Sequence, residues 1–139
     1  MARREVDYTV TDEGRDKGKT YHLTEMSCVQ AEKWAIRTMR AMLLAGIPVS
    51  AEMIAGGIGS LANVNPALIL NIDLDEVFAL GEELMQCVSI KPDPMHPGLI
   101  RKNAQMVESD IEEIRTRLNL KLAVYRLIVG FSPADAPST

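Results

Sequence analysis

One short run of residues resembles a phosphate-binding motif of nucleotide-binding enzymes. The residues from Gly14 to Thr20 read GRDKGKT, close to the GxxxxGK[ST] loop whose amides cradle nucleotide phosphates. The run is one residue shorter than that loop. The residues that follow, from Lys19 to Leu23, alternate like a strand, whereas a phosphate loop opens a helix. We therefore interpret this run as the tip of a β-hairpin and keep a nucleotide-binding enzyme as a remote alternative.

A second glycine motif, GIGSLA from Gly57 to Ala62, fits the loosest form of a dinucleotide-binding fingerprint. No clear strand precedes the motif and no βαβ repeat surrounds it, and both are needed for that fold. Glycines at these positions more readily allow a tight turn or the close approach of two helices. The motif therefore predicts no cofactor.

The remaining reactive side chains are isolated from one another. His22 and His96 have no partner at metal-ligand spacing, and Cys28 and Cys87 lie far apart. Four acids, at positions 75, 76, 82 and 83, fit the solvent-facing side of a helix better than a catalytic pair. We expect no metal, no cofactor and no catalytic residues, so the protein is not expected to be an enzyme.

Composition narrows the class of partner. A chain of 139 residues is the size of one domain. Its net charge of −4 is concentrated between residues 41 and 95, which hold seven acids and one base. No basic stripe and no long apolar run are present, so neither nucleic acid nor a membrane is expected as a partner. No signal-peptide pattern begins the chain, which with two unpaired cysteines favours the cytoplasm over secretion.

The elements expected to position these residues form an α+β fold. Alternating residues over 5–10 and 19–24 predict an N-terminal β-hairpin, which a short third strand over 87–91 could extend. Leu99-Ile100-Arg101 is a further candidate strand. About four mostly amphipathic helices should pack on this sheet. We expect one domain over residues 1–131 and a flexible tail over 132–139.

Capping signals predict where the helices lie. Ser27 with Gln30 should begin a helix that ends near Ala45, with Gly46 as its stop. Residues 46–72 favour short, imperfect helices, and Asp73 with Glu76 should begin the next long one. The last helix should open at Ser109 and Glu112 and end at Gly130. Its expected buried stripe consists of Ile111, Ile114, Leu118, Leu122, Tyr125 and Val129.

Several segments together resemble a known family. Residues 14–26 (GRDKGKTYHLTEM), 30–37 (QAEKWAIR), 108–114 (ESDIEEI) and 127–131 (LIVGF) are similar to tail assembly chaperones of tailed bacteriophages. The resemblance spans most of the chain, but residues 46–72 and 92–98 carry little of it. It implies a protein of the bacterial host cytoplasm, made during virion assembly. That protein would bind the helical tape-measure protein, keep it soluble and help tail-tube subunits assemble around it.

Such a client would need an apolar groove on this chain. We expect residues 46–72 and the apolar end of the last helix to supply it, and the acids between 75 and 83 to attract basic client segments. The expected partner-binding residues are Met53, Ile54, Ile58, Leu61, Leu120, Val124, Leu127 and Ile128. The alternative is a structural virion component or small adaptor that self-associates, and a homo-oligomer stays open in either case.

Overall fold

A computed structural model describes residues 3–51 and 70–129 of the chain. The elements along the chain are β1 (Glu5–Thr9), β2 (Thr20–Thr24), α1 (Cys28–Leu44), α3 (Leu74–Met85), β3 (Val88–Lys91) and α4 (Ile114–Val129). Two compact units divide them. One contains the sheet and α4 and is formed by the chain up to Met26 and from Glu83 onward. The other, Ser27–Glu82, contains α1 and most of α3, and we call it the helical unit.

The sheet has three antiparallel strands in the order β1-β2-β3. The expected hairpin is confirmed, with Asp7 opposite His22 and Thr9 opposite Thr20. The expected third strand is confirmed as well, because β3 pairs with β2 along its whole length. The predicted strand at 99–101 is reduced to a single bridge between Ile90 and Arg101.

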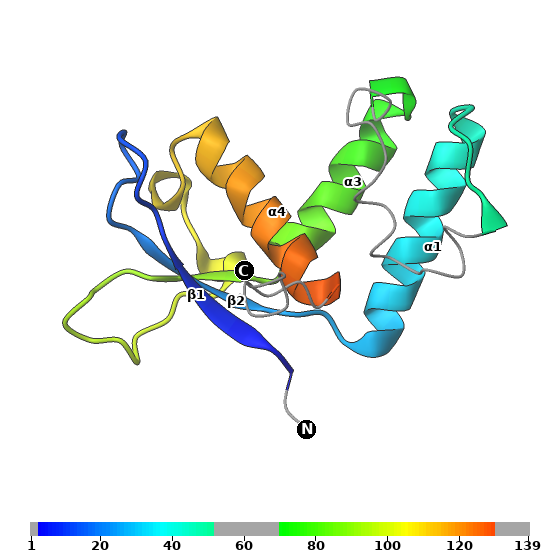
Figure 1. Cartoon of the computed structure of the whole chain (residues 1–139). Coiled ribbons are helices and arrows are strands. Elements are labelled where there is room, and N and C mark those ends of the chain that lie inside the picture. Colours follow the sequence, from blue (N-terminus) through cyan, green and yellow to red (C-terminus); the bar gives the residue numbers. More distant parts are fainter. Residues whose placement is uncertain (1–2, 52–69, 130–139) are drawn as a thin grey trace, which may run out of the picture. The chain divides into compact units, whose positions relative to one another are not determined.

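One face of the sheet forms the core of the sheet unit. Tyr21 and Leu23 of β2 and Val88 and Ile90 of β3 point to this face and are at most 3% exposed. Because side chains alternate along a strand, these four residues lie on the same side. The C-terminal helix α4 packs against β2 (Figure 1). The core of this unit is therefore aliphatic, with one tyrosine whose hydroxyl donates a hydrogen bond to the carbonyl of Asp110.

The other face of the sheet carries a chain of charges that crosses all three strands. His22 Nδ1 lies 2.7 Å from Asp7 Oδ1, and His22 Nε2 lies 2.7 Å from Glu5 Oε1. Lys91 Nζ donates to Asp7 Oδ2 at 2.8 Å. Both ring nitrogens of a histidine can donate only when the ring is protonated. Hydrogen bonding to Asp7, offset in part by burial and reinforced by Glu5, raises the pKa of His22.

This charge chain predicts a stability that depends on pH. A raised pKa in the folded state means that the stabilisation is fully present below the unfolded pKa of about 6.5 and is lost as pH rises through the folded value. Thermal unfolding of the wild type should show that the free energy of unfolding is lower at pH 9 than at pH 6 by on the order of 1 kcal/mol. A His22→Gln variant should lose most of that difference. An equal decrease in both proteins would show that another group is responsible.

In the helical unit, the capping signals place α1 and α3 as predicted. Ser27 Oγ accepts a hydrogen bond from the amide of Gln30 at 3.2 Å, and Asp73 Oδ2 accepts one from the amide of Glu76 at 3.3 Å. Gly46 follows α1 with a φ of +81°, a conformation that side chains disfavour. Trp34 is buried and its Nε1 donates to the carbonyl of Leu80 at 2.9 Å. This hydrogen bond ties α1 to α3.

Across residues 3–51 and 70–129 the structure has three long α-helices, and about four helices were expected over the whole chain. One expectation about the helices was wrong. The last helix begins at Ile114, five residues after Ser109, because a short 3₁₀ turn over Glu108–Asp110 comes first. Most of the expected short helices within 46–72 lie outside the described residues, as do Gly130 and the expected tail. No helix among the described residues has the length and apolar character needed to span a bilayer.

Candidate protein-binding surfaces

Helix α4 has two apolar sides, and only one of them packs on the sheet. The buried side consists of Thr116, Leu120 and Val124, of which Leu120 and Val124 are 0% exposed. The other side consists of Ile114, Leu118 and Leu122, which are 77%, 58% and 45% exposed. The two rows are offset by two residues, which is roughly 200° around a helix, so they point in nearly opposite directions. We call Ile114, Leu118 and Leu122 the α4 outer stripe.

This orientation corrects the sequence analysis twice. Of the row expected to be buried, Ile114, Leu118 and Leu122 are exposed instead, whereas Ile111, Tyr125 and Val129 are partly buried. Leu120 and Val124, expected to bind a partner, are buried in the chain's own core and cannot contact one. Leu127 and Ile128 are partly buried. Met53, Ile54, Ile58 and Leu61 lie outside the described residues.

A buried carboxylate from the hairpin tip fixes where α4 begins. Asp16 is 1% exposed. Its Oδ2 accepts from the amide of Glu113 at 2.8 Å, and its Oδ1 accepts from the amide of Glu112 at 3.0 Å. Amides at the start of a helix have no partner within the helix, so a carboxylate there stabilises the helix end. Asp16 therefore acts as a cap supplied from a distant part of the chain.

The pKa of Asp16 reflects these contacts. Burial by itself raises the pKa, but hydrogen bonds from Lys19, Thr116 and the amides of Glu112 and Glu113 outweigh burial and lower it to about 2. The carboxylate is therefore ionised at neutral pH. Nothing in the sequence marked Asp16 for this role, because its partners lie almost a hundred residues away.

The phosphate-loop-like run is the hairpin tip, as predicted. It joins two antiparallel strands, with φ angles of +147° at Gly14 and +86° at Gly18. Lys19, in the position of the phosphate-binding lysine, donates to Asp16 Oδ1 and to the carbonyl of Ser109, both at 2.7 Å. Arg15 also reaches the start of α4, where its Nε donates to Glu113 Oε1 at 2.7 Å. The charged residues of the tip therefore anchor α4.

A second exposed apolar surface lies on α1, in the helical unit. Val29, Ile36 and Leu43 recur every seven residues and are 62%, 57% and 57% exposed. Lys33 and Arg40, which are also exposed, occur at the same seven-residue interval. We call these five residues the α1 outer face. Such a face resembles one side of a coiled-coil helix, in which apolar residues are flanked by charges.

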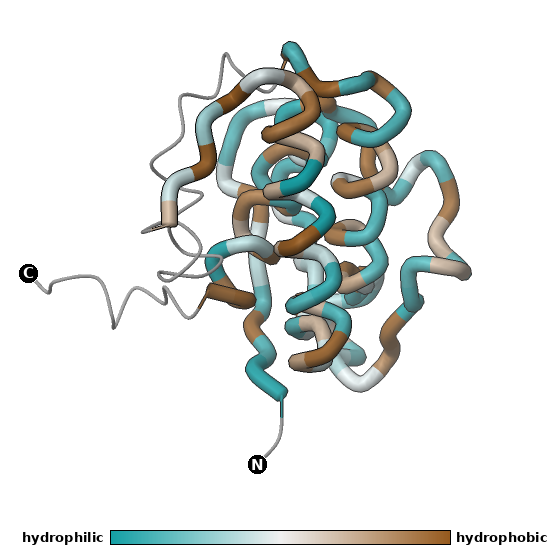
Figure 2. Tube along the Cα trace, turned by 90° about the vertical axis from the view of Figure 1, so that its right-hand side faces the viewer, coloured by the Kyte–Doolittle hydropathy of each residue, from teal (hydrophilic) through white to brown (hydrophobic). Residues whose placement is uncertain are grey.

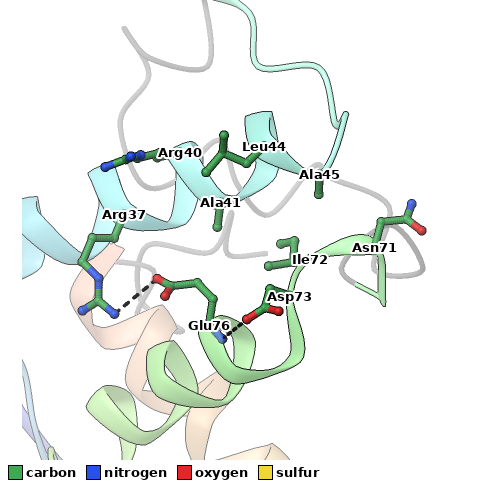
Figure 3. Close-up of a pocket in the computed structure, with 9 residues that line it drawn as sticks. All are labelled: Arg37, Arg40, Ala41, Leu44, Ala45, Asn71, Ile72, Asp73 and Glu76. Carbon is green, nitrogen blue, oxygen red and sulfur yellow. Dashed lines mark hydrogen bonds and ion pairs between the residues drawn. The ribbon is translucent and has the colours of Figure 1, made fainter.

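A groove of about 760 Å³ runs beside this face between α1 and the start of α3 (Figure 3). Ala41 and Ile72 are buried in its floor, and Leu44, which is 78% exposed, lies at its edge. Arg37 of α1 crosses to Glu76 of α3, with Nη2 3.3 Å from Oε1. The residues that line the groove are Arg37, Arg40, Ala41, Leu44, Ala45, Asn71, Ile72, Asp73 and Glu76. Of these, Asn71 and Ile72 belong to the segment expected to form a client groove.

The reactive side chains are kept apart. Cys28 is exposed at the start of α1, whereas burial raises the pKa of the Cys87 thiol to about 11. His96 is paired with Asp93 in the proline-rich loop, with 2.6 Å between Nδ1 and Oδ2. Within the two described segments, no three His, Cys, Asp or Glu side chains are grouped so that they could hold a metal ion. The features that stand out are therefore apolar surfaces.

Searches of protein-family models, curated proteins and solved structures give no match to this chain. Apolar and polar residues alternate along the coiled parts of the trace in Figure 2. Helices α1, α3 and α4 each leave large apolar side chains exposed, which include Leu74 and Phe78 on α3. Contiguous exposed apolar surface is typical of proteins that bind other proteins.

Proposed function

We propose that this protein is a non-catalytic chaperone that binds an amphipathic helix of a client protein. The α4 outer stripe is the observation that carries the proposal. A helix that already buries one apolar side against its own sheet has no need of a second for stability. Exposing Ile114, Leu118 and Leu122 to water is unfavourable by roughly 25 cal/mol for each Å² that remains uncovered. A client helix would cover this surface in the helix-in-groove mode.

The resemblance to tail assembly chaperones suggests which protein the client is. The tape-measure protein of a tailed phage is long and helical, and it needs a partner until tail-tube subunits enclose it. We therefore propose that the client is a tape-measure protein, bound in the cytoplasm of a bacterial host. The tail-tube protein is the second proposed partner. This function needs no cofactor, metal or reactive side chain.

A structural virion component is the second candidate, and the position of β1 favours it. This strand lies at the edge of the sheet, and four of its five residues are exposed. An exposed edge can pair with a strand of another molecule. However, Glu5 and Asp7 place two charges on it, and charges on edge strands oppose such pairing. Mass spectrometry of purified virions separates the two candidates, because an assembly chaperone should be missing from the particle.

The client-binding proposal predicts the effect of charges placed on the α4 outer stripe. We expect Leu118→Asp with Leu122→Asp to give a folded protein that no longer keeps the client soluble. The reason is that a buried interface would then contain two unpaired carboxylates. Co-expression of the tape-measure protein with each variant, followed by measurement of its soluble fraction, provides the test. The affinity for the client should decrease at least about tenfold, which corresponds to roughly 1.4 kcal/mol in binding, and the soluble fraction of the client should fall with it.

The control places one aspartate on another exposed apolar side chain of the sheet unit. Val107 is 57% exposed and lies outside α4, so Val107→Asp should leave the client soluble. A double variant at positions 118 and 122 that folds and still solubilises the client as well as the wild type would refute α4 as the client site.

A further inference from the structure

The α1 outer face combines apolar and basic side chains on a single side of the helix. Val29, Ile36 and Leu43 lie with Lys33 and Arg40 within about 80° of arc and extend for about 21 Å along the helix axis. All five are exposed. The side chains opposite them, including Trp34, Ala41 and Met42, are buried. The face is therefore separate from the surface by which α1 packs in its own unit.

Charge makes this face a poor match for a second copy of itself. In an antiparallel pair centred on Ile36, Lys33 would lie beside Arg40 of the other copy. Glu32 is also exposed and borders the face on the side away from Lys33 and Arg40, so in a parallel pair with the same seven-residue repeat it would lie near Glu32 of the other copy. Like charges in these positions are destabilising. The partner that fits is instead a helix with an apolar stripe and carboxylates where Lys33 and Arg40 would meet it.

We propose that the α1 outer face binds a partner helix whose apolar residues repeat every seven positions and are flanked by Asp or Glu on the side that meets Lys33 and Arg40. This inference rests on the proposed function, since it describes the chemistry of a client segment. It differs from the expectation that basic client segments are attracted to the acids of α3. Two cations spaced seven residues apart select acidic flanks at the same spacing, in the way that charges select partners in coiled coils.

Two synthetic peptides of the same length test the proposal. Both carry leucine at the core positions of three heptads, and the flanking positions hold glutamate in one peptide and lysine in the other. We expect fluorescence anisotropy to show that the glutamate peptide binds at least about tenfold more tightly at low salt. The preference should weaken as salt rises, because exposed charges are screened over about 8 Å at physiological ionic strength. Equal binding of the two peptides would overturn the proposal.

Charge reversal locates the site. Lys33→Glu with Arg40→Glu should invert the preference, so that the lysine peptide binds more tightly. The matched control is Arg115→Glu with Arg126→Glu, which changes the net charge equally at two exposed positions on α4. This control should retain the wild-type preference. If the α4 pair inverts the preference and the α1 pair does not, the α1 assignment is wrong.

Two further outcomes separate this inference from others. In the first, the wild type binds neither peptide but binds vesicles of phosphatidylserine and phosphatidylcholine, and the variant with Lys33→Glu and Arg40→Glu does not bind the vesicles. This result would mean that the face binds membranes, and it would overturn the proposal. The proposed function can survive that result. If the tape-measure protein stays soluble with the wild type and precipitates with the α4 double variant, the chaperone role stands while the acidic-helix partner is rejected.

Discussion

Val124→Asp should unfold the sheet unit. Val124 is 0% exposed on the side of α4 that packs on the sheet. The substitution removes packed methyl groups and places an unpaired carboxylate in the core, a combination that costs more than about 4 kcal/mol. That loss is comparable with the roughly 5–15 kcal/mol that stabilises a typical domain. Urea titration followed by far-UV circular dichroism should show little or no folded baseline for this variant.

The matched substitution lies two residues away on the same helix. Leu122 is 45% exposed, so Leu122→Asp should change the free energy of unfolding by only about 1 kcal/mol, mainly through helix propensity. The pair therefore tests which side of α4 faces the sheet. A stable Val124→Asp protein together with an unfolded Leu122→Asp protein would show that the helix is rotated by about half a turn, as the sequence pattern alone had indicated.

Asp16→Ala should cause the second-largest loss. The substitution removes the cap of α4 and leaves Lys19 and the amides of Glu112 and Glu113 without their carboxylate. Breaking a buried, hydrogen-bonded charge pair costs roughly 3–5 kcal/mol, and partial exposure of Lys19 favours the lower end of that range. Urea titration should therefore show that the free energy of unfolding is lower by about 3 kcal/mol than in the wild type. Asp16→Asn should lose less, because its amide oxygen can still accept one of the hydrogen bonds.

Acid provides an independent test of the same cap. Because the pKa of Asp16 is lowered to about 2 in the folded protein, its contribution is present above the unfolded pKa of about 3.9 and disappears as pH falls through the folded value. The difference in stability between wild type and Asp16→Ala should thus shrink between pH 5 and pH 2. Asp12→Ala, which alters an exposed acid of the same loop, should have an effect within about 0.5 kcal/mol. A constant difference between wild type and Asp16→Ala across this range would argue against an ionised cap.

These predictions separate the chain's own stability from its proposed binding. Asp16, Leu120 and Val124 are buried within the sheet unit, whereas Ile114, Leu118 and Leu122 are exposed and contribute much less to its core. Variants of the first group should lose the fold and the client together. Variants of the second group should lose the client alone. A chaperone that binds through surplus apolar surface requires this difference.

Local chemistry determined much of this protein from its sequence. Ser27 and Asp73 lie at the starts of α1 and α3, and Gly46 follows the end of α1, because capping depends on residues within one turn of the helix end. The hairpin followed from period-2 alternation on both sides of a glycine-bearing loop.

Only the tertiary structure decided which side of α4 is buried and where that helix begins. Two apolar rows two residues apart satisfy helical periodicity equally well. The packing of α4 against the sheet determines which row is buried: Leu120 and Val124 are in the core, and Leu118 and Leu122 remain exposed. The start of α4 depends on Asp16, whose amide partners are distant in sequence and adjacent in space. Contacts of this kind arise from the folded chain as a whole, so no local pattern could reveal them.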